Sequence, residues 1–173
     1  IAHLTTEKEI SLLHSGDVSE KRITSEVSPI HLWFEIGDFA EYGNLIKCNP
    51  SIKTKEDRTA LRRALREDKI DIIATDHAPH TWEEKQKPYF DAPSGMPSIQ
   101  HSLLLILQLV EQGELTLEKM VEKMAHNPAK LFGIKDRGYI KEGYFADFVL
   151  INPNKKTIVT KDSLQSKCKW SPF

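Results

Sequence analysis

The chain has few cysteines, no long apolar run and no excess of charge of one sign, and each absence excludes a class of protein. Cys48 and Cys168 are the two cysteines in 173 residues, so no disulfide framework is expected and a cytoplasmic location is favoured. The longest apolar run, Leu103–Leu107, is far shorter than the ~20 residues of a membrane-spanning helix. The 24 basic and 25 acidic residues balance, and no basic stripe alternates with aromatics, which argues against nucleic acid as a partner.

Strand and helix patterns alternate along the first three quarters of the chain. The run at residues 22–27 predicts a strand and the apolar run that begins at residue 71 predicts a buried strand over residues 71–75, while residues 30–44 and 80–95 are predicted to be irregular. Capping residues and helical spacing of apolar side chains predict helices at residues 6–15, 54–68, 97–112, 117–125 and 127–133. This alternation is typical of parallel strands joined by helical crossovers, and therefore of an α/β fold.

The pattern changes at about residue 134. Gly138, Gly143 and Pro153 divide the remaining sequence into short β runs, so we expect a small β subdomain over residues 134–173. A complete (β/α)8 barrel needs roughly 250 residues. The chain is therefore expected to contain half of such a barrel, over residues 1–133, and to be a piece of a longer protein.

The most informative segment is Thr75–His80, with the sequence TDHAPH, which follows the apolar run at residues 71–74. Asp76 therefore falls where a strand ends and a loop begins, the position at which α/β barrels hold their catalytic groups. A carboxylate beside two imidazoles offers a metal ligand or a general base, and the proline restricts the backbone. An isolated Asp-His pair is also explained by an aspartate that caps a turn beside two surface histidines.

Segments along the whole chain resemble dihydroorotases, the metal-dependent cyclic amidohydrolases of pyrimidine biosynthesis. Thr75–His80 is similar to the family signature. Lys47–Arg58 and Ser25–Leu32 are similar to its segments of the Lys-x-Asn-Pro-Pro-Leu-Arg and Glu-Val-Thr-Pro-His-His-Leu types. Ala2–Glu7 resembles the histidine element that ends the sixth barrel strand, and Gly138–Leu150 resembles the strand pair that closes many amidohydrolases.

The resemblance implies a fold and an activity. The fold would be a (β/α)8 TIM barrel of the metal-dependent hydrolase type, with residues 1–133 as its C-terminal half (strands six to eight) and residues 134–173 as part of a small β subdomain. The activity would be the reversible hydrolysis of L-dihydroorotate to N-carbamoyl-L-aspartate, with two Zn²⁺ ions per complete active site. The binding partner would be this small-molecule substrate, and neither nucleic acid nor a membrane is expected as a partner. The protein could also form a homodimer.

Asp76 and His3 are the expected metal ligands. Metal coordination lowers the pKa of water from 15.7 to about 7, which supplies a nucleophile at neutral pH. Asp76 suits a double role as ligand and as the catalytic base that passes a proton to the leaving nitrogen. A lone histidine such as His3 is also explained as structural, but the resemblance identifies it with the sixth-strand ligand. His31 matches the second histidine of the family's Pro-His-His, while Ile30 replaces the first, so we assign His31 either to packing or to a position behind the metal ligands.

Four residues are the expected substrate contacts. Asn49 can donate and accept hydrogen bonds, and the corresponding asparagine of the family contacts substrate, although an asparagine before Pro50 is also explained as a turn former. His80 matches another residue that contacts substrate. Ser94 and Gly95 match a Phe-Gly or similar pair whose backbone lines the site. Ser94 departs from that pattern, but backbone contacts would tolerate the change.

Several family ligands have no counterpart in the chain. The first-strand His-x-His, the carboxylated bridging lysine and the fifth-strand histidine would all precede Ile1, and two ligands alone do not make a binuclear site. Two alternatives therefore stay open. One is another cyclic amidohydrolase, such as a hydantoinase or an allantoinase. The other is a catalytically inactive dihydroorotase-like scaffold, against which the joint retention of His3, Asp76 and His80 argues.

Overall fold

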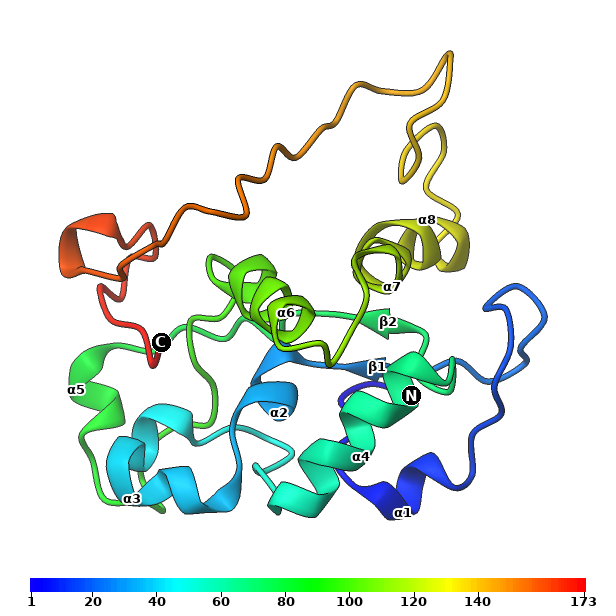
Figure 1. Ribbon diagram of the computed structural model, residues 1–173. Coiled ribbons are helices and arrows are strands. Elements are labelled where there is room, and N and C mark those ends of the chain that lie inside the picture. Colours follow the sequence, from blue (N-terminus) through cyan, green and yellow to red (C-terminus); the bar gives the residue numbers. More distant parts are fainter.

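A computed structural model describes residues 1–173 (Figure 1). The strands are β1 (Glu26–Val27) and β2 (Ile72–Ile73). The α-helices are α1 (Glu7–Ile10), α2 (Pro29–Trp33), α3 (Phe39–Tyr42), α4 (Lys55–Arg66), α5 (Trp82–Lys85), α6 (Ser102–Glu111), α7 (Leu117–Val121) and α8 (Asn127–Leu131). Shorter helical turns are η1 (Ile36–Asp38), η2 (Gly43–Ile46), η3 (Glu122–His126), which is a π-helix, and η4 (Lys161–Ser163).

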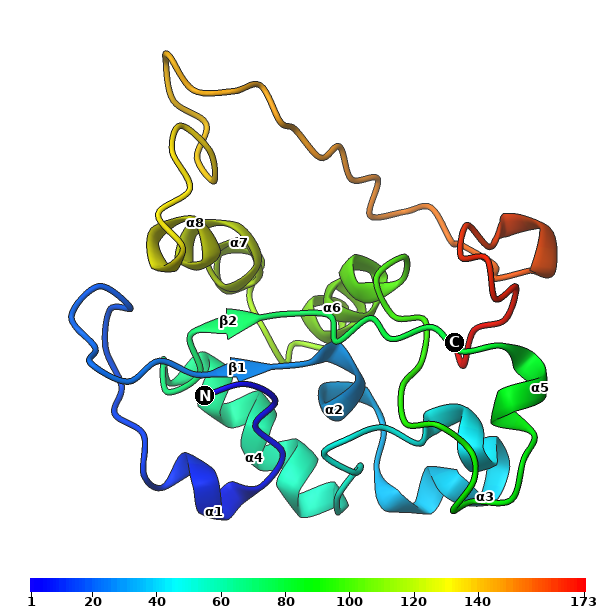
Figure 2. The same cartoon turned by 180° about the vertical axis from the view of Figure 1, so that it is seen from behind.

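The two strands are parallel and form the centre of the fold. Glu26 pairs with Ile72 and Val27 with Ile73. The N-terminal segment runs beside β1, where the backbone N–H of Leu4 donates to the carbonyl of Glu26 at 2.9 Å. In Figures 1 and 2, α1 and α4 lie on one side of the strands, and α7 and α8 lie on the other. Parallel strands joined by helical segments agree with the predicted α/β class.

Helix α4 forms one wall of the main core. Thr54 caps it by accepting a hydrogen bond from the backbone N–H of Asp57, and the Asp57 side chain accepts one from the backbone N–H of Thr54. Its inward face then buries four apolar side chains at helical spacing: Ala60, Leu61, Ala64 and Leu65. Residues of α1, β1, α6 and α7 join this core, so the predicted helix at residues 54–68 is confirmed and holds the strands from one side.

The predicted loop at residues 30–44 is wrong. Helix α2 begins at Pro29, which occupies its first turn, and Glu35 caps η1 by accepting a hydrogen bond from the backbone N–H of Gly37. Apolar side chains of this region pack in a second core with Ile46 and Trp170. Tertiary packing therefore orders short helices that lack the repeating pattern of a long one.

The last 40 residues contain no strand in this structure. Residues 134–145 turn back on themselves beside α8, where the Tyr139 ring stacks on His126. Residues 146–160 then run as an extended arm (Figure 1), in which Phe148 and Leu150 are 66% and 101% exposed. A β segment needs a partner strand for its backbone hydrogen bonds. Residues 146–160 make such bonds only within local turns. The subdomain division at residue 134 stays a prediction. After the arm the chain returns to the loop that follows β2 (Figure 2), where the Trp170 indole N–H donates to the carbonyl of His80 at 2.7 Å.

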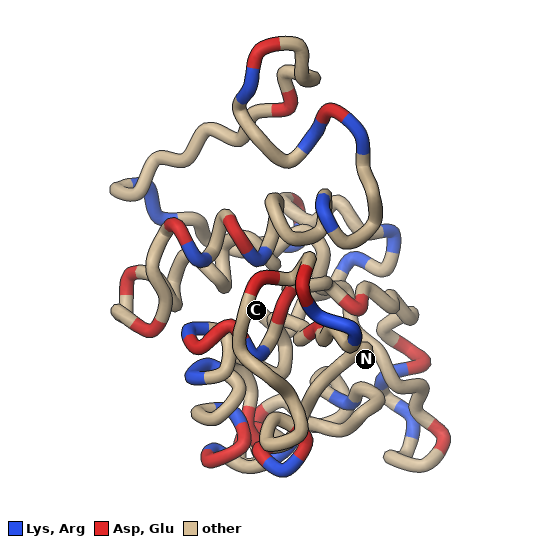
Figure 3. Tube along the Cα trace, turned by 90° about the vertical axis from the view of Figure 1, so that its right-hand side faces the viewer, with Lys and Arg blue, Asp and Glu red and all other residues tan.

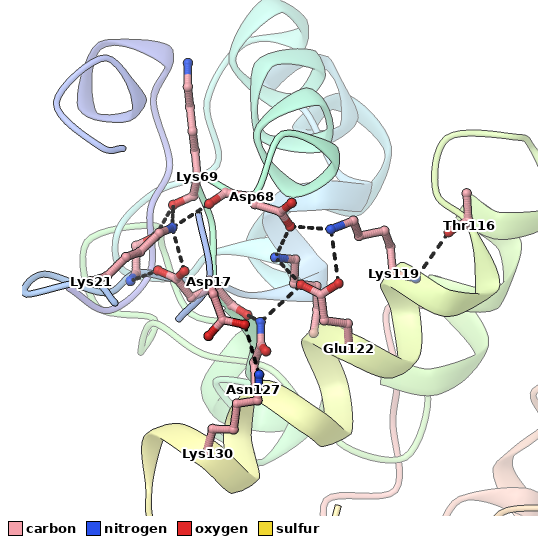
Figure 4. A network of polar contacts seen from close by, with 12 residues as sticks. Asp17, Lys21, Asp68, Lys69, Thr116, Lys119, Glu122, Asn127 and Lys130 are labelled. Carbon is pink, nitrogen blue, oxygen red and sulfur yellow. Dashed lines mark hydrogen bonds and ion pairs between the residues drawn. The ribbon is translucent and has the colours of Figure 1, made fainter. Parts of the chain in front are cut away.

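A polar network lies at the edge where β2 begins (Figure 4). Asp68 accepts hydrogen bonds from Lys119 at 2.5 Å and from the fully buried Lys123 at 2.8 Å, and Glu122 contacts both lysines. Burial opposes ionisation of Asp68, but these hydrogen bonds outweigh it and lower the pKa of its carboxyl. The network lies at the amino end of β2, just before Asp71, whereas Asp76 follows the carboxyl end of the strand. The two places are therefore at opposite ends of β2. It joins η3 to the base of the strands.

Charge is spread over the molecule rather than concentrated. In the view of Figure 3, acidic and basic residues are interspersed along the chain. None of the helices is both long and apolar enough to cross a membrane. Both cysteines are free.

Candidate metal and substrate site

His3 and Asp76 face each other at the carboxyl ends of the strands. The Nε2 atom of His3 lies 3.6 Å from Oδ1 of Asp76, and the two side chains are 28% and 22% exposed. They come from the N-terminal segment and from the loop after β2, which are far apart in sequence. The structure therefore brings the two predicted metal ligands together and leaves both accessible.

Glu26 lies behind His3. Its Oε1 atom is 2.7 Å from Nδ1 of His3, although the contact lacks the angle of a hydrogen bond, and neither atom has another partner. A carboxylate beside Nδ1 favours the proton on that nitrogen and leaves Nε2, which faces Asp76, free to bind a metal. Glu26 is thus placed where a hydrogen bond from Nδ1 would hold the imidazole toward Asp76.

Both facing residues have a strained backbone. His3 has φ of 55° and Asp76 has φ of 47°, in the left-handed region that residues other than glycine rarely adopt. Such strain costs on the order of 1–3 kcal/mol per residue and is concentrated at functional sites. Strain at both members of one facing pair is a second observation that marks this place as a site.

The loop that carries Asp76 is held by its neighbours. The carbonyl of Thr75 accepts hydrogen bonds from the hydroxyls of Ser98 at 2.6 Å and Ser28 at 3.3 Å. Nδ1 of His77 accepts from the backbone N–H groups of Ser98 at 3.1 Å and Ile99 at 3.2 Å, so this imidazole carries its proton on Nε2. His77, the first histidine of the TDHAPH segment, therefore fixes the loop.

Three of the four predicted substrate contacts cluster, and the fourth is tied to them. His80 Nε2 lies 3.1 Å from the carbonyl oxygen of Ser94, and the backbone N–H of Gly95 donates to the carbonyl of Lys47 at 2.8 Å. Lys47 leads directly into Asn49, whose side chain is exposed and makes no hydrogen bond within the chain. The segments that carry the four residues are thus joined by hydrogen bonds.

His31 lies between the substrate segment and the ligand pair. Its Nε2 atom is 2.9 Å from the carbonyl oxygen of Pro50 and 3.6 Å from Sγ of Cys48. Burial lowers the pKa of His31, while the nearby His3 and Asp76 act on it in opposite directions. Burial raises the pKa of the Cys48 thiol to about 12, so the sulfur stays protonated and is no nucleophile. The predicted packing role of His31 agrees with this environment.

The donor set fits part of a metal site. His3 offers an imidazole nitrogen and Asp76 a carboxylate oxygen, which are donors that zinc accepts. No group of three or more His, Cys, Asp or Glu side chains in this chain is arranged to hold a metal ion. Catalytic zinc takes three protein ligands, so His3 and Asp76 would be two members of a larger set.

Two hollows adjoin the loop after β2, but neither contains His3 or Asp76. One, of about 370 Å³, is lined by His77, Pro79, His80, Thr81, Ser166, Lys167 and Cys168. The other, of about 240 Å³, lies between the start of α6 and the C-terminal segment. The candidate site is therefore defined by the facing of His3 and Asp76.

Gly95 packs against the loop too closely for any side chain. A Cβ atom there would lie 2.6 Å from Cβ and 2.7 Å from the carbonyl oxygen of Ala78, and the residue has φ of 129°. We expect Gly95→Ala to lower the free energy of unfolding by about 2 kcal/mol or more in chemical denaturation. Gly113→Ala is the control, because φ is 73° there but no atom lies within 4 Å, and should cost about 1 kcal/mol. Equal losses in the two variants would contradict the packing argument.

Sequence reasoning missed two side chains that support the site. Glu26, behind His3, could have been found, because it lies one residue before the end of the run 22–27 that is predicted as a strand. Lys85 was hidden by its charge: it is 1% exposed although it lies in a stretch of charged residues that looks solvated. Only the packing of the loop shows that its ammonium group points inward.

Comparison with known proteins places this geometry in a family. Over all of its length the chain is 40% identical to the dihydroorotase of Geobacter metallireducens and 37% identical to that of Clostridium acetobutylicum, and it covers 41% of each. The structure is similar to that of the L-hydantoinase (dihydropyrimidinase) of Arthrobacter aurescens, with a TM-score of 0.78 and 29% identity. The match covers 84% of this chain and 34% of the hydantoinase chain. It also shares its fold with the Saccharomyces cerevisiae dihydroorotase, with a TM-score of 0.70 and 22% identity. That match covers 79% of this chain and 38% of the dihydroorotase chain.

The chain thus spans about two fifths of the length of the curated relatives it matches. Residues 19–169 match the model of the amidohydrolase family. The matched structures are amidohydrolase barrel enzymes, which accounts for parallel strands whose carboxyl ends hold His3 and Asp76. This chain belongs to the amidohydrolase family, whose members are metal-dependent hydrolases.

Proposed function

We propose that the chain is the C-terminal half of a dihydroorotase barrel. Residues 1–133 would supply strands six to eight with their helices, and residues 134–173 part of a small β subdomain. The observation that carries the proposal is the facing of His3 and Asp76 at 3.6 Å on the strand ends. Identities of 37–40% to curated dihydroorotases over the full chain favour this member of the family.

The proposed reaction is the reversible hydrolysis of the cyclic amide of L-dihydroorotate to N-carbamoyl-L-aspartate. Two zinc ions per complete site, held here by His3 and Asp76 together with ligands outside this chain, would activate water and polarise the carbonyl. Asp76 accepts a proton from the attacking water and donates it to the ring nitrogen as the carbon–nitrogen bond breaks. Glu26 keeps the His3 imidazole turned toward Asp76.

Substrate recognition is assigned to the segments joined around Gly95. The free amide of Asn49 can donate to the substrate carboxylate and accept from a ring N–H. The imidazole of His80 and the backbone of Ser94 and Gly95 supply the opposite wall. Hydrogen bonds from His80 to Ser94 and from Gly95 to Lys47 hold these groups in register before substrate binds.

The hydantoinase alternative rests on a specific observation, the structural match to L-hydantoinase. Hydantoins and dihydrouracil lack the ring carboxylate of dihydroorotate, so substrate choice separates the two functions.

We place the protein in the cytoplasm with a small-molecule substrate, supported by its balanced charge and two free cysteines. Light scattering would decide whether it is a homodimer.

The decisive experiment is an assay of the full-length protein that contains this chain, loaded with zinc. We expect hydrolysis of dihydroorotate, with kcat/KM at least about a hundredfold above that for hydantoin or dihydrouracil, because the polar groups of a site built for the carboxylate are left unpaired with the analogues. A preference for hydantoin would favour the alternative. Inactivity toward all three, with zinc bound, would favour the scaffold.

Asn49→Ala and His80→Ala test the division between substrate contacts and ligands. We expect each to raise KM for dihydroorotate about tenfold or more while the zinc content stays that of the parent, because neither side chain is assigned as a ligand. His14→Ala is the control, since His14 is exposed and forms no ion pair or side-chain hydrogen bond. Loss of zinc in either variant, measured by metal analysis, would overturn the assignment.

A further inference from the structure

Lys85 is buried without a counterion. Its side chain is 1% exposed, at the end of α5, and its ammonium group donates to three backbone carbonyls, of Gly95 at 2.7 Å, Pro93 at 2.9 Å and Lys47 at 3.2 Å. The indole of Trp170 lies 5.9 Å from Nζ. No acidic side chain is among these partners, so the charge is balanced by peptide dipoles and an aromatic face.

The three carbonyls belong to the two segments that carry the predicted substrate contacts. Lys47 precedes Asn49 by two positions, and Pro93 and Gly95 flank Ser94. The segments are also joined directly, by the hydrogen bond from the Gly95 N–H to the Lys47 carbonyl at 2.8 Å. The ammonium group therefore binds both walls of the proposed substrate site from behind.

Fold stability alone is a poor reason for this arrangement. Burial lowers the pKa of Lys85 to about 8, and the charge of Lys47 acts in the same direction, so the folded protein keeps the charge at a cost. The carbonyls, in contrast, need a donor at this point to hold their orientation.

We infer that Lys85 is a positioning residue for substrate binding, which sets the distance between the Asn49 segment and the Ser94–Gly95 segment through its three carbonyl contacts. This inference rests on the proposed function. Lys85 does not touch substrate; it acts through the backbone of Lys47 and Gly95. Loss of the ammonium group lets the two walls separate, which weakens substrate binding more than it slows the chemical step at Asp76.

The test replaces Lys85 by methionine in the full-length protein loaded with zinc. We expect Lys85→Met to raise KM for dihydroorotate about tenfold or more, with kcat within about threefold and zinc content unchanged. Lys87→Met is the matched control, because Lys87 is exposed and its side chain makes no hydrogen bond, and should keep the KM of the parent. A fall of kcat by about tenfold in Lys85→Met with an unchanged KM would overturn the inference.

A double-mutant cycle with Asn49→Ala separates positioning from general damage. If Lys85 acts through Asn49, the increase in KM of the double variant should be well below the product of the increases in the two single variants. Independent effects would instead multiply to an increase of about a hundredfold. A multiplicative result would overturn the inference. If the parent fails to hydrolyse dihydroorotate, the proposed function fails; if the parent is active and Lys85→Met keeps its KM, only the role of Lys85 fails.

A second variant covers the case in which methionine prevents folding. Lys85→Gln keeps an amide donor without the charge and should give a KM between those of the parent and of Lys85→Met. If neither variant folds, Lys85 is a folding residue and the inference is wrong.

Discussion

Replacement of Asp76 by asparagine is expected to lower kcat/KM for dihydroorotate by about a thousandfold or more in the full-length protein. Asparagine keeps an oxygen that can face His3, but its amide cannot take up the proton that must reach the leaving nitrogen. The fold should be unchanged, because asparagine tolerates the positive φ of 47° at this position better than most residues do. Steady-state kinetics and a thermal melt measure the two effects separately.

Asp91→Asn is the matched control for this prediction. Asp91 is an exposed acid farther along the same loop, with no side-chain hydrogen bond or ion pair. It should retain the activity of the parent. Activity of the Asp76 variant within about tenfold of the parent would show that this carboxylate is not the proton carrier.

Replacement of Asp71 by asparagine is expected to cause the largest loss of stability. The Asp71 side chain is 1% exposed and lies 2.6 Å from the ammonium nitrogen of Lys21, which is 8% exposed. Its second oxygen accepts a hydrogen bond from the backbone N–H of Ser25 at 2.8 Å. The variant keeps the shape of the side chain but leaves the buried Lys21 charge unpaired, at a cost of about 3–5 kcal/mol.

Chemical denaturation of the full-length protein measures this effect. Asp17→Asn is the control, because Asp17 pairs with Lys130 at 3.0 Å on the surface, with side chains 48% and 38% exposed. Solvent screens that pair, so the midpoint should hardly move. A midpoint shift no larger for Asp71→Asn than for Asp17→Asn would mean that water reaches Lys21 and that the ion pair is not buried in solution.

The facing pair His3 and Asp76 and the long helix α4 could be predicted from the sequence. Asp76 is singled out because an apolar run ends just before it, whereas His3 is singled out by its resemblance to the sixth-strand histidine of the family. The helix start after His3 is of the capping-box type, which the structure confirms at Thr6 and Glu9. Helix α4 was predicted almost to its ends, since its cap and the spacing of its buried alanines and leucines are both local signals. Each of these features is specified by a few residues that are neighbours in the sequence.

Other elements depended on contacts between distant segments. Ladder pairing is limited to β1 and β2, two residues each, although longer runs were predicted, because a strand is defined by its partner and not by its own sequence. The turns in residues 30–44 lack a repeating pattern; Ile30 and Phe34 belong to a buried cluster that includes Trp170, and Phe34 stacks on Phe173 from the far end of the chain. No local pattern contains that information.

Sequence alone determined the identity of the chemical groups: an imidazole and a carboxylate at strand ends, with an amide, a second imidazole and a glycine nearby. Only the tertiary structure decided their arrangement, since the 3.6 Å contact of His3 with Asp76 spans 73 positions of the chain. It also decided that Glu26 lies behind His3 and that the Lys85 ammonium points inward to three carbonyls. The physical reason is that residue type fixes what a side chain can donate or accept, whereas packing of distant segments fixes which partner it meets and how far it is from water.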